Sequence, residues 1–265
     1  MNIFVMTDME GISGVCRAEQ VLPDGGRYQE GQSFLTQEVN ACVEGCFAGG
    51  ARKVVVRDGH HKGLNFLWND LDARAEYIMG ALARERMPAL GDFDGVILLG
   101  YHAMAGTPEA ILEHTMSSKT WQNFWINGRK CGEIAIEAGI AGDHGVPVVM
   151  VSGDDKVCRE ARAFLPGVET VAVKKGLGVE GGQFLSKEKA HGLIRDGAAR
   201  AVQRCRTLKP CRFKRPVTMR LELVSRGLVP VHRQGVKVLD GRTYEVRGRT
   251  VEETLRLFCY DTDEE

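Results

Sequence analysis

Four side chains that commonly bind metal ions follow directly after three short apolar runs of the sequence. Asp8 and Glu10 follow the first run, His60 follows the second and His102 follows the third. In an extended backbone, residues two apart face the same side, so Asp8 and Glu10 present their carboxylates together. The carboxyl ends of parallel strands lie along one edge of an open sheet, where ligands bind. The sequence therefore predicts that these four side chains meet at one edge.

Two carboxylates and two imidazoles without a thiolate suit zinc or another borderline divalent metal. A carboxylate placed between two cations reduces their repulsion, and a pair of metals ~3.5–4 Å apart can activate water and polarise a carbonyl. Taken alone, a strand-end aspartate is usually a cap or turn residue, and a single histidine is usually structural. Their coincidence at corresponding strand ends favours a metal site.

Two further residues could join this chemistry. His114 lies in a loop-like stretch after the third strand, where it could act as an acid, a base or a charge stabiliser, or stay an exposed loop histidine. Glu133 opens a predicted helix, where a carboxylate usually stabilises the positive end of the helix dipole. The residues alone leave both alternatives open.

The elements that would position these side chains alternate between short β-rich runs and helical patterns. This alternation predicts βαβ units, and hence an α/β fold with a mainly parallel, doubly wound sheet that extends to about residue 180. Asp154 has the type and position of a helix N-cap. The expected strands lie at 3–6, 54–56, 95–99, 146–151 and 170–173, and the expected helices at 34–47, 133–141 and 155–165.

One segment departs from this pattern. Residues 121–133 alternate apolar and polar side chains around Asn127-Gly128, which is the strongest short signal for a β-hairpin. We therefore expect an inserted hairpin that interrupts the parallel winding.

The C-terminal part has a different character. A long amphipathic helix is expected from Ser186 to about Leu208, followed by strands near 217–224 and 236–246 and a short helix from Val251. These patterns predict a metal-binding catalytic domain at 1–185 and a smaller α+β subdomain at 186–265. The basic side chains of this part fit a solvated helix face or a subunit contact better than a nucleic-acid site, because no aromatic residues interleave with them.

Composition excludes several classes of protein. The chain has 265 residues, of which 43% are hydrophobic and 26% charged, so it is neither disordered nor a disulfide miniprotein. Its 35 basic and 35 acidic side chains balance to zero net charge, which provides no overall field for nucleic acid or an anionic membrane. No apolar run approaches the ~20 residues of a membrane helix, and the first residues lack the cationic start of a signal peptide. We expect a cytoplasmic protein with no nucleic-acid or membrane partner.

Other motifs are weaker. GLGVEG at 176–181 has the spacing of a dinucleotide-binding loop, but no clear helix starts inside it, so a flexible loop over the cleft is the better interpretation. No P-loop, H-E-x-x-H or G-x-S-x-G motif occurs, which argues against P-loop ATPases, zincins and the usual α/β-hydrolases.

Several spaced motifs, in the correct order, resemble the D-aminopeptidase family of zinc metallopeptidases, the DppA type. They are TDMEGISG, DGHHKGLN, LGYHAMAGTPEAILEHTM and FWINGRKCGEIAIEAGIAGDHGVPVVMVSGDD. The likeness is dense to about residue 175 and looser beyond Ser186. It implies a homodecamer of two stacked five-fold rings around a channel that admits only short peptides.

The resemblance also implies site residues. It implies two zinc ions per chain, with Asp8 bridging both. Glu10 and His102 would complete one metal, and His60 and Glu133 would complete the other. His114 falls at the position of the family's catalytic histidine.

The leading hypothesis is a dinuclear-zinc aminopeptidase that releases N-terminal residues, expected to be of D configuration, from short peptides such as D-Ala-D-Ala. A metal-activated hydroxide would attack the scissile carbonyl, with His114 assisting as nucleophile, acid/base or oxyanion stabiliser. One alternative is a binuclear metal hydrolase of phosphoesters or non-peptide amides. Another is a non-catalytic ring-forming scaffold with a degenerate site.

Overall fold

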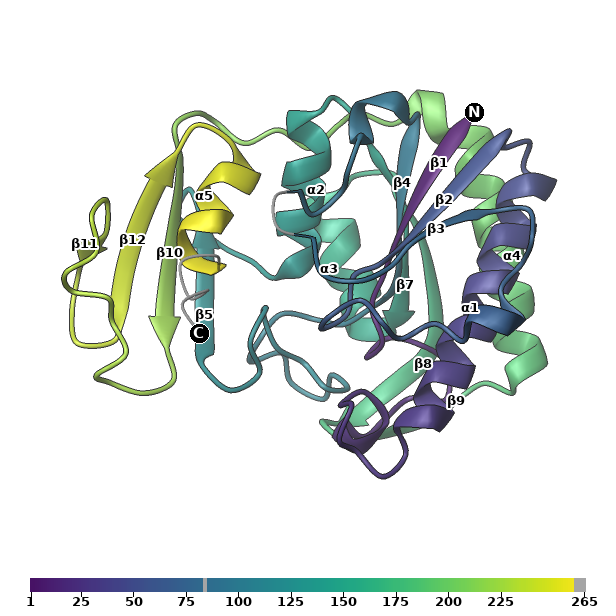
Figure 1. Ribbon diagram of the computed structural model, residues 1–265, viewed down its shortest axis with the longest axis horizontal. Coiled ribbons are helices and arrows are strands. Elements are labelled where there is room, and N and C mark those ends of the chain that lie inside the picture. Colours follow the sequence, from purple (N-terminus) through teal and green to yellow (C-terminus); the bar gives the residue numbers. More distant parts are fainter. Residues whose placement is uncertain (83–84, 260–265) are drawn as a thin grey trace.

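Two β-sheets organise the chain (Figure 1). The computed structural model describes residues 1–82 and 85–259. The seven-stranded sheet, here the main sheet, is parallel except for its last pair, β8 and β9. In spatial order its strands are β3 (Glu76–Ile78), β2 (Lys53–Asp58), β1 (Asn2–Thr7), β4 (Gly95–Tyr101), β7 (Val148–Asp154), β8 (Glu169–Gly178) and β9 (Gly181–Phe184).

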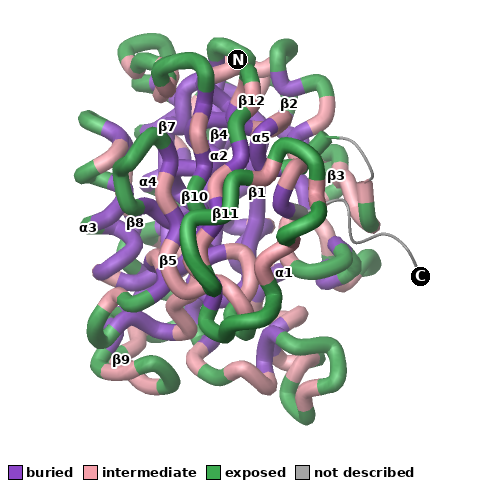
Figure 2. The backbone as a smooth tube through the Cα atoms, turned by 90° about the vertical axis from the view of Figure 1, so that its left-hand side faces the viewer, coloured by how far each residue is buried: buried purple, intermediate pink, exposed green. Residues whose placement is uncertain are grey.

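Helices cover both faces of the main sheet, as its apolar strands require. Alternate residues of β1 show the division, since Ile3 and Val5 enter the core on one face while Phe4 and Met6 enter the core on the other. Figure 2 shows the central strands β1, β4 and β7 as largely buried segments, with exposed segments in the outer loops. The helices are α1 (Tyr28–Ala48) and α4 (Lys187–Arg204) on the first face, and α2 (Glu133–Asp143) and α3 (Asp155–Phe164) on the second.

The five-stranded sheet, here the small sheet, is antiparallel and has its own core. Helix α2 lies between the two cores, because Ile134 and Ala138 pack on the main sheet while Ile136 and Ile140 pack on the small one. In spatial order the small sheet contains β11 (Lys237–Val238), β12 (Thr243–Gly248), β10 (Val217–Leu223), β5 (Trp121–Ile126) and β6 (Arg129–Lys130), and α5 (Val251–Cys259) packs on it. Short 3-10 turns lie at η1 (Ala18–Gln20), η2 (Trp68–Asp70), η3 (Leu90–Asp92) and η4 (Cys205–Thr207).

The predicted fold class is confirmed, and so is the inserted hairpin. Asn127 and Gly128 both have positive φ, 49° and 81°, as a tight hairpin turn requires. Asp154 caps α3 by accepting hydrogen bonds from the main-chain N–H groups of Lys156 and Val157. Helix α1 begins at Tyr28, about two turns earlier than the apolar pattern indicated.

Each of the two parts expected on either side of residue 185 contains an element that packs with the other part. Helix α4 follows this position but packs against α1 and the main sheet, whereas β5 precedes it and pairs with β10. Packing therefore follows the two sheets, and the domain boundary at 185 itself stays a prediction.

The expectation for residues 176–181 was wrong. These residues form the end of β8 and its turn into β9 rather than a flexible loop, because Gly176 and Gly178 pair with Gly182 and Gly181 across the two strands. The hairpin is anchored to its surroundings, since the Leu112 N–H donates to the carbonyl of Val179 at 2.8 Å.

Across 1–82 and 85–259, no helix combines the length and the apolar character that a membrane span needs.

Candidate metal centre

The centre lies where the winding of the main sheet reverses direction. The chain proceeds from β1 to β2 and β3 on one side, and from β4 to β7 and β8 on the other, so the ends of β1 and β4 flank a topological switch point. Ligand sites of open α/β sheets lie at such points. The loop after β1 crosses the end of β4, where the Gly11 N–H donates to the Gly100 carbonyl at 2.7 Å. A side chain at Gly11 would collide with the carbonyl of Tyr101, so only glycine permits this crossing.

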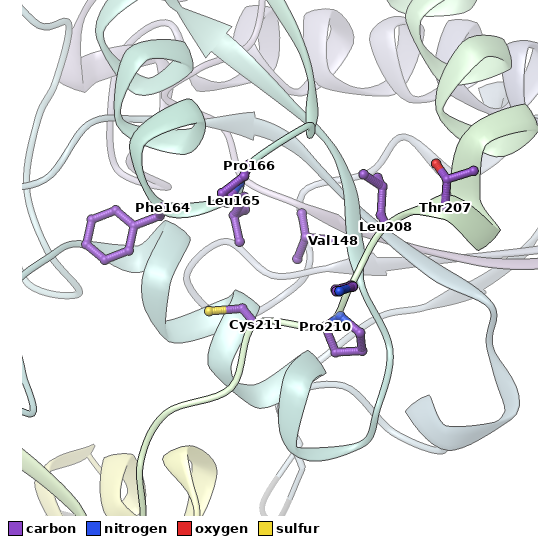
Figure 3. A pocket seen from close by; sticks show the side chains of 9 residues that line it. Val148, Phe164, Leu165, Pro166, Thr207, Leu208, Pro210 and Cys211 are labelled. Atoms are coloured by element: carbon purple, nitrogen blue, oxygen red, sulfur yellow. The ribbon is translucent and has the colours of Figure 1, made fainter.

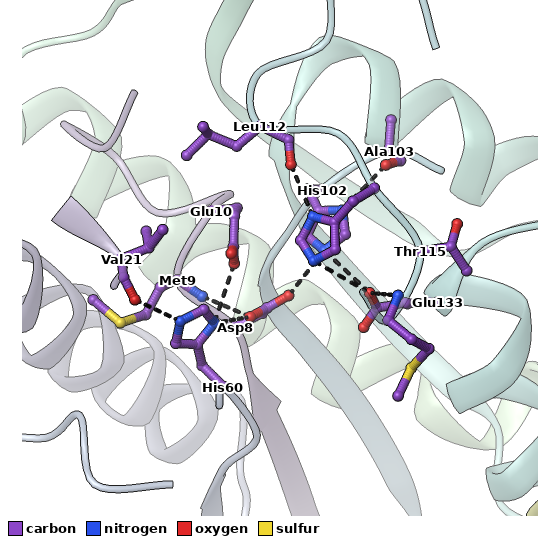
Figure 4. Close-up of polar contacts among 12 residues, drawn as sticks. Asp8, Met9, Glu10, Val21, His60, His102, Ala103, Leu112, Thr115 and Glu133 are labelled. Carbon is purple, nitrogen blue, oxygen red and sulfur yellow. Dashed lines mark hydrogen bonds and ion pairs between the residues drawn. The ribbon is translucent and has the colours of Figure 1, made fainter. Parts of the chain in front are cut away.

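The first donor group consists of Asp8, Glu10 and His60 (Figure 4). The Nδ1 atom of His60 lies 2.8 Å from Asp8 Oδ1 and 3.3 Å from Glu10 Oε2. The other ring nitrogen, Nε2, donates to the carbonyl of Val21 at 2.8 Å. The ligand atoms of the three side chains all lie within 4.8 Å of one another.

The second donor group consists of His102, His114 and Glu133. The Nε2 atom of His102 lies 3.3 Å from Glu133 Oε1 and also 3.3 Å from Asp8 Oδ2. His114 stacks on His102 with ring centroids 3.9 Å apart, and its Nε2 lies 3.8 Å from Glu133 Oε1. Asp8 thus directs one oxygen toward each group.

Main-chain carbonyls fix the orientation of all three imidazoles. His102 Nδ1 donates to the carbonyl of Ala103 at 3.1 Å, and His114 Nδ1 donates to that of Leu112 at 3.0 Å, as His60 Nε2 does to Val21. A carbonyl only accepts hydrogen bonds, so the second nitrogen of each neutral ring presents a lone pair to the carboxylates. Histidines that bind metals are oriented in this way.

The donor atoms need a positive charge between them. Glu10 Oε2 and His102 Nε2 are buried and have no hydrogen-bond partner among the described residues. A lone pair on His102 Nε2 that faces carboxylate oxygens at 3.3 Å is repelled unless a proton or a metal ion lies between. Oxygen and nitrogen donors at this spacing fit divalent metal ions such as zinc.

The pKa values of the buried histidines and of Glu133 reflect how closely these imidazoles and carboxylates face one another. Burial by itself lowers the pKa of His60, but the carboxylates of Glu10 and Asp8 outweigh it and hold this pKa well above its ordinary value. Burial likewise lowers the pKa of His102, and Glu133 and Asp8 again raise it well above normal. Burial raises the pKa of Glu133, yet His102 and His114 bring it down to about 2. The centre therefore attracts cations.

A cavity of about 520 Å³ opens over the centre and contacts both donor groups, a volume suited to a small-molecule ligand. Arg86 lines it, with its Nε donating to buried Glu137 and its Nη2 3.7 Å from Glu133 Oε2. Sequence patterns did not single out Arg86, because nothing in residues 81–86 marks it as facing the site. The other lining residues are Asp8, Glu10, Leu22, Gly59, His60, His61, His114, Met116, Ser117, Ser118, Lys119 and Glu133.

A different hollow lies near the start of β7, lined by Val148, Phe164, Leu165, Pro166, Thr207, Leu208, Lys209, Pro210 and Cys211 (Figure 3). This lining contains neither a carboxylate nor an imidazole, so it offers no comparable donor set.

The structure brings all six predicted site residues together. It groups them differently from the pairing that the family resemblance implied, since Glu10 lies with His60, and His102 lies with Glu133. The implied pairing of Glu10 with His102 and of His60 with Glu133 at each metal stays a prediction.

Comparisons with known proteins agree on one family. A family model described as D-aminopeptidase matches residues 1–260. A curated D-aminopeptidase of Bacillus subtilis (strain 168) is 36% identical over 214 residues, which cover 79% of this chain and 77% of that protein. The solved structure of the Zn-dependent D-aminopeptidase DppA from Bacillus subtilis, described as a self-compartmentalizing protease, superimposes with a TM-score of 0.92. It is 31% identical, and the match covers 97% of this chain and 94% of that one.

Proposed function

The chain belongs to the D-aminopeptidase family, and we propose that it is a dinuclear-zinc aminopeptidase that releases N-terminal D-amino acids from short peptides such as D-Ala-D-Ala. The observation that carries this proposal is the position of Asp8 between two donor groups. Its Oδ1 is 2.8 Å from His60 and its Oδ2 is 3.3 Å from His102. One carboxylate with its oxygens divided in this way can bridge two cations.

Each ion would have its own protein ligands. Glu10 and His60 would hold one zinc with Asp8, and His102 and Glu133 would hold the other with Asp8. Two zinc ions held there would supply an activated water and polarise the scissile carbonyl.

We assign proton transfer to His114. Its Nδ1 proton is committed to the carbonyl of Leu112, so Nε2 is the nitrogen that can accept or donate a proton in the cavity. Stacking on His102 keeps the ring beside Glu133. In this position His114 Nε2 would accept a proton from the attacking water and pass it to the leaving amine.

The comparison also bears on the metal and the assembly. The solved relative is described as Zn-dependent and self-compartmentalizing, which supports zinc as the metal and a homo-oligomer as the assembly. We propose a homodecamer that admits short peptides to an enclosed chamber. The cytoplasmic location stays a prediction.

Metal analysis coupled to a paired assay tests the proposal. The purified protein should hold about two zinc ions per chain and release D-alanine from D-Ala-D-Ala, with lower activity on L-Ala-L-Ala and none on an aryl phosphate. Metal-free preparations that retain full activity would refute the zinc mechanism. Activity on the aryl phosphate alone would identify a phosphoesterase instead.

A further inference from the structure

Lys174, on β8, is a buried lysine that reaches the loop carrying Glu10. The residue is only 4% exposed. The Nζ atom donates to three main-chain carbonyls, those of Glu10 at 2.6 Å, Ile12 at 2.9 Å and Val15 at 2.7 Å. An ammonium group has three N–H donors, so this one is fully used on a single loop.

A buried acid also holds this loop. Glu38, on α1, accepts hydrogen bonds from the main-chain N–H of Ser13 at 2.8 Å and from its hydroxyl. Burial lowers the pKa of Lys174 to about 8 even though the Glu38 charge opposes this shift. Burying an ammonium is unfavourable, and a methionine in its place would leave three carbonyls without a donor. The lysine thus has a role that an apolar side chain could not fill.

Glu10 depends on this anchoring more than the other two carboxylates do. Asp8 accepts from the N–H of Met9 at 2.9 Å, and Glu133 accepts from the N–H of Met116 at 2.8 Å. Glu10 Oε2, in contrast, is buried without a hydrogen-bond partner among the described residues and has only the 3.3 Å approach to His60. Its placement therefore follows from where its main chain is held.

We propose that Lys174 is a positioning residue for Glu10: by fixing the main chain at residues 10–15, it holds the Glu10 carboxylate beside His60 so that the first donor group can bind its metal ion. The inference rests on the proposed function, because it requires that this group holds a metal.

The test uses Co²⁺ as the probe, since its visible absorption reports the geometry around each ion. The metal-free full chain is titrated with Co²⁺ as wild type, as Lys174→Met and as Lys175→Met. Lys175 is the matched control, because it is the exposed neighbour on the same strand. In Lys174→Met we expect one ion to bind as in wild type and the other to bind roughly 10–100-fold more weakly, with altered absorption, the range typical for loss of an outer-shell partner. Lys175→Met should match wild type in both.

Thermal melting of each metal-free variant separates local from global effects. If Lys174→Met does not fold, the Co²⁺ titration is made with Ser13→Ala instead. This variant removes one hydrogen bond to the same loop and leaves Lys174 in place. It should weaken the same ion by a smaller factor, and unchanged binding would overturn the inference. Equal weakening of both ions, or wild-type binding in folded Lys174→Met, would also overturn it. A wild-type protein that binds no Co²⁺ would overturn the proposed function itself, and the inference with it.

Discussion

The two donor groups are built in different ways. In the first group, Asp8, Glu10 and His60 all follow directly after the adjacent parallel strands β1 and β2. In the second group, His102 follows β4, whereas Glu133 begins a helix that lies between two cores and His114 lies in an irregular loop. The first group is thus a product of local strand geometry, and the second depends on tertiary packing.

The loop of His114 shows what that dependence involves. Glu109, Leu112 and Met116 all have positive φ, between 51° and 59°, which is uncommon for residues other than glycine. Such conformations persist where the surroundings hold them. Here the Leu112 N–H bonds to Val179 on the β8–β9 hairpin, and the Met116 N–H bonds to Glu133. Distant elements therefore set the position of His114.

The largest effect should come from the residue that the two groups share. Asp8→Ala should abolish the binding of both ions. Peptidase turnover should fall by several orders of magnitude, because an acceleration of ~10⁶-fold or more depends on them. Zinc content per chain and D-Ala-D-Ala hydrolysis measure this. Retention of one ion at wild-type affinity would show that Asp8 belongs to one group only.

A substitution in either group should remove the zinc ion of that group alone. Glu10→Ala should lose the ion beside His60, and Glu133→Ala the ion beside His102, leaving about one zinc per chain in either case. The variant that combines Glu10→Ala with Glu133→Ala should bind no zinc. This result would distinguish the grouping found here from the implied pairing of Glu10 with His102, because Glu10→Ala combined with His60→Ala should still leave one ion bound.

His114→Ala should retain both ions and lose turnover. Removing a general acid or base lowers kcat by ~10²–10⁴-fold, while zinc content should match that of wild type. His232→Ala, which changes an exposed histidine outside the cavity, is the control. Loss of one zinc ion from His114→Ala would make this residue a third ligand of the second group instead.

The contrast also explains what the sequence could predict. Parallel strands end at one edge, so the pattern alone placed Asp8, Glu10, His60 and His102 together. The parallel fold followed from periodicity, and its hairpin from Asn127-Gly128.

Glu133 and His114 needed the family resemblance, because a helix start and a loop histidine have ordinary structural roles. The pairing of the hairpin with β10 was not predictable from local pattern, because it joins residues about 100 positions apart. Arg86 and Lys174 carry no local signal at all.

The smallest expected effect concerns a buried acid near the second group. Buried Glu160 accepts from the N–H of Met104 at 2.8 Å, near His102, and its other oxygen has no hydrogen-bond partner among the described residues. Burial raises its pKa from 4.5 to about 7. The folded protein therefore binds more protons than the unfolded chain between these values. The stability that the protonated acid contributes is fully present below pH 4.5 and is lost as the pH rises through 7.

Glu160→Gln imitates the protonated acid at every pH. In metal-free protein it should match wild type near pH 4.5 and exceed its free energy of unfolding at pH 8 by up to roughly 3 kcal/mol, the energy that corresponds to this pKa shift. Urea unfolding at the two pH values measures the difference. Lys175→Met, which changes an exposed side chain, should show no such pH dependence. A Glu160→Gln advantage that is equal at both pH values would mean that packing, and not the carboxylate charge, limits stability beneath the second group.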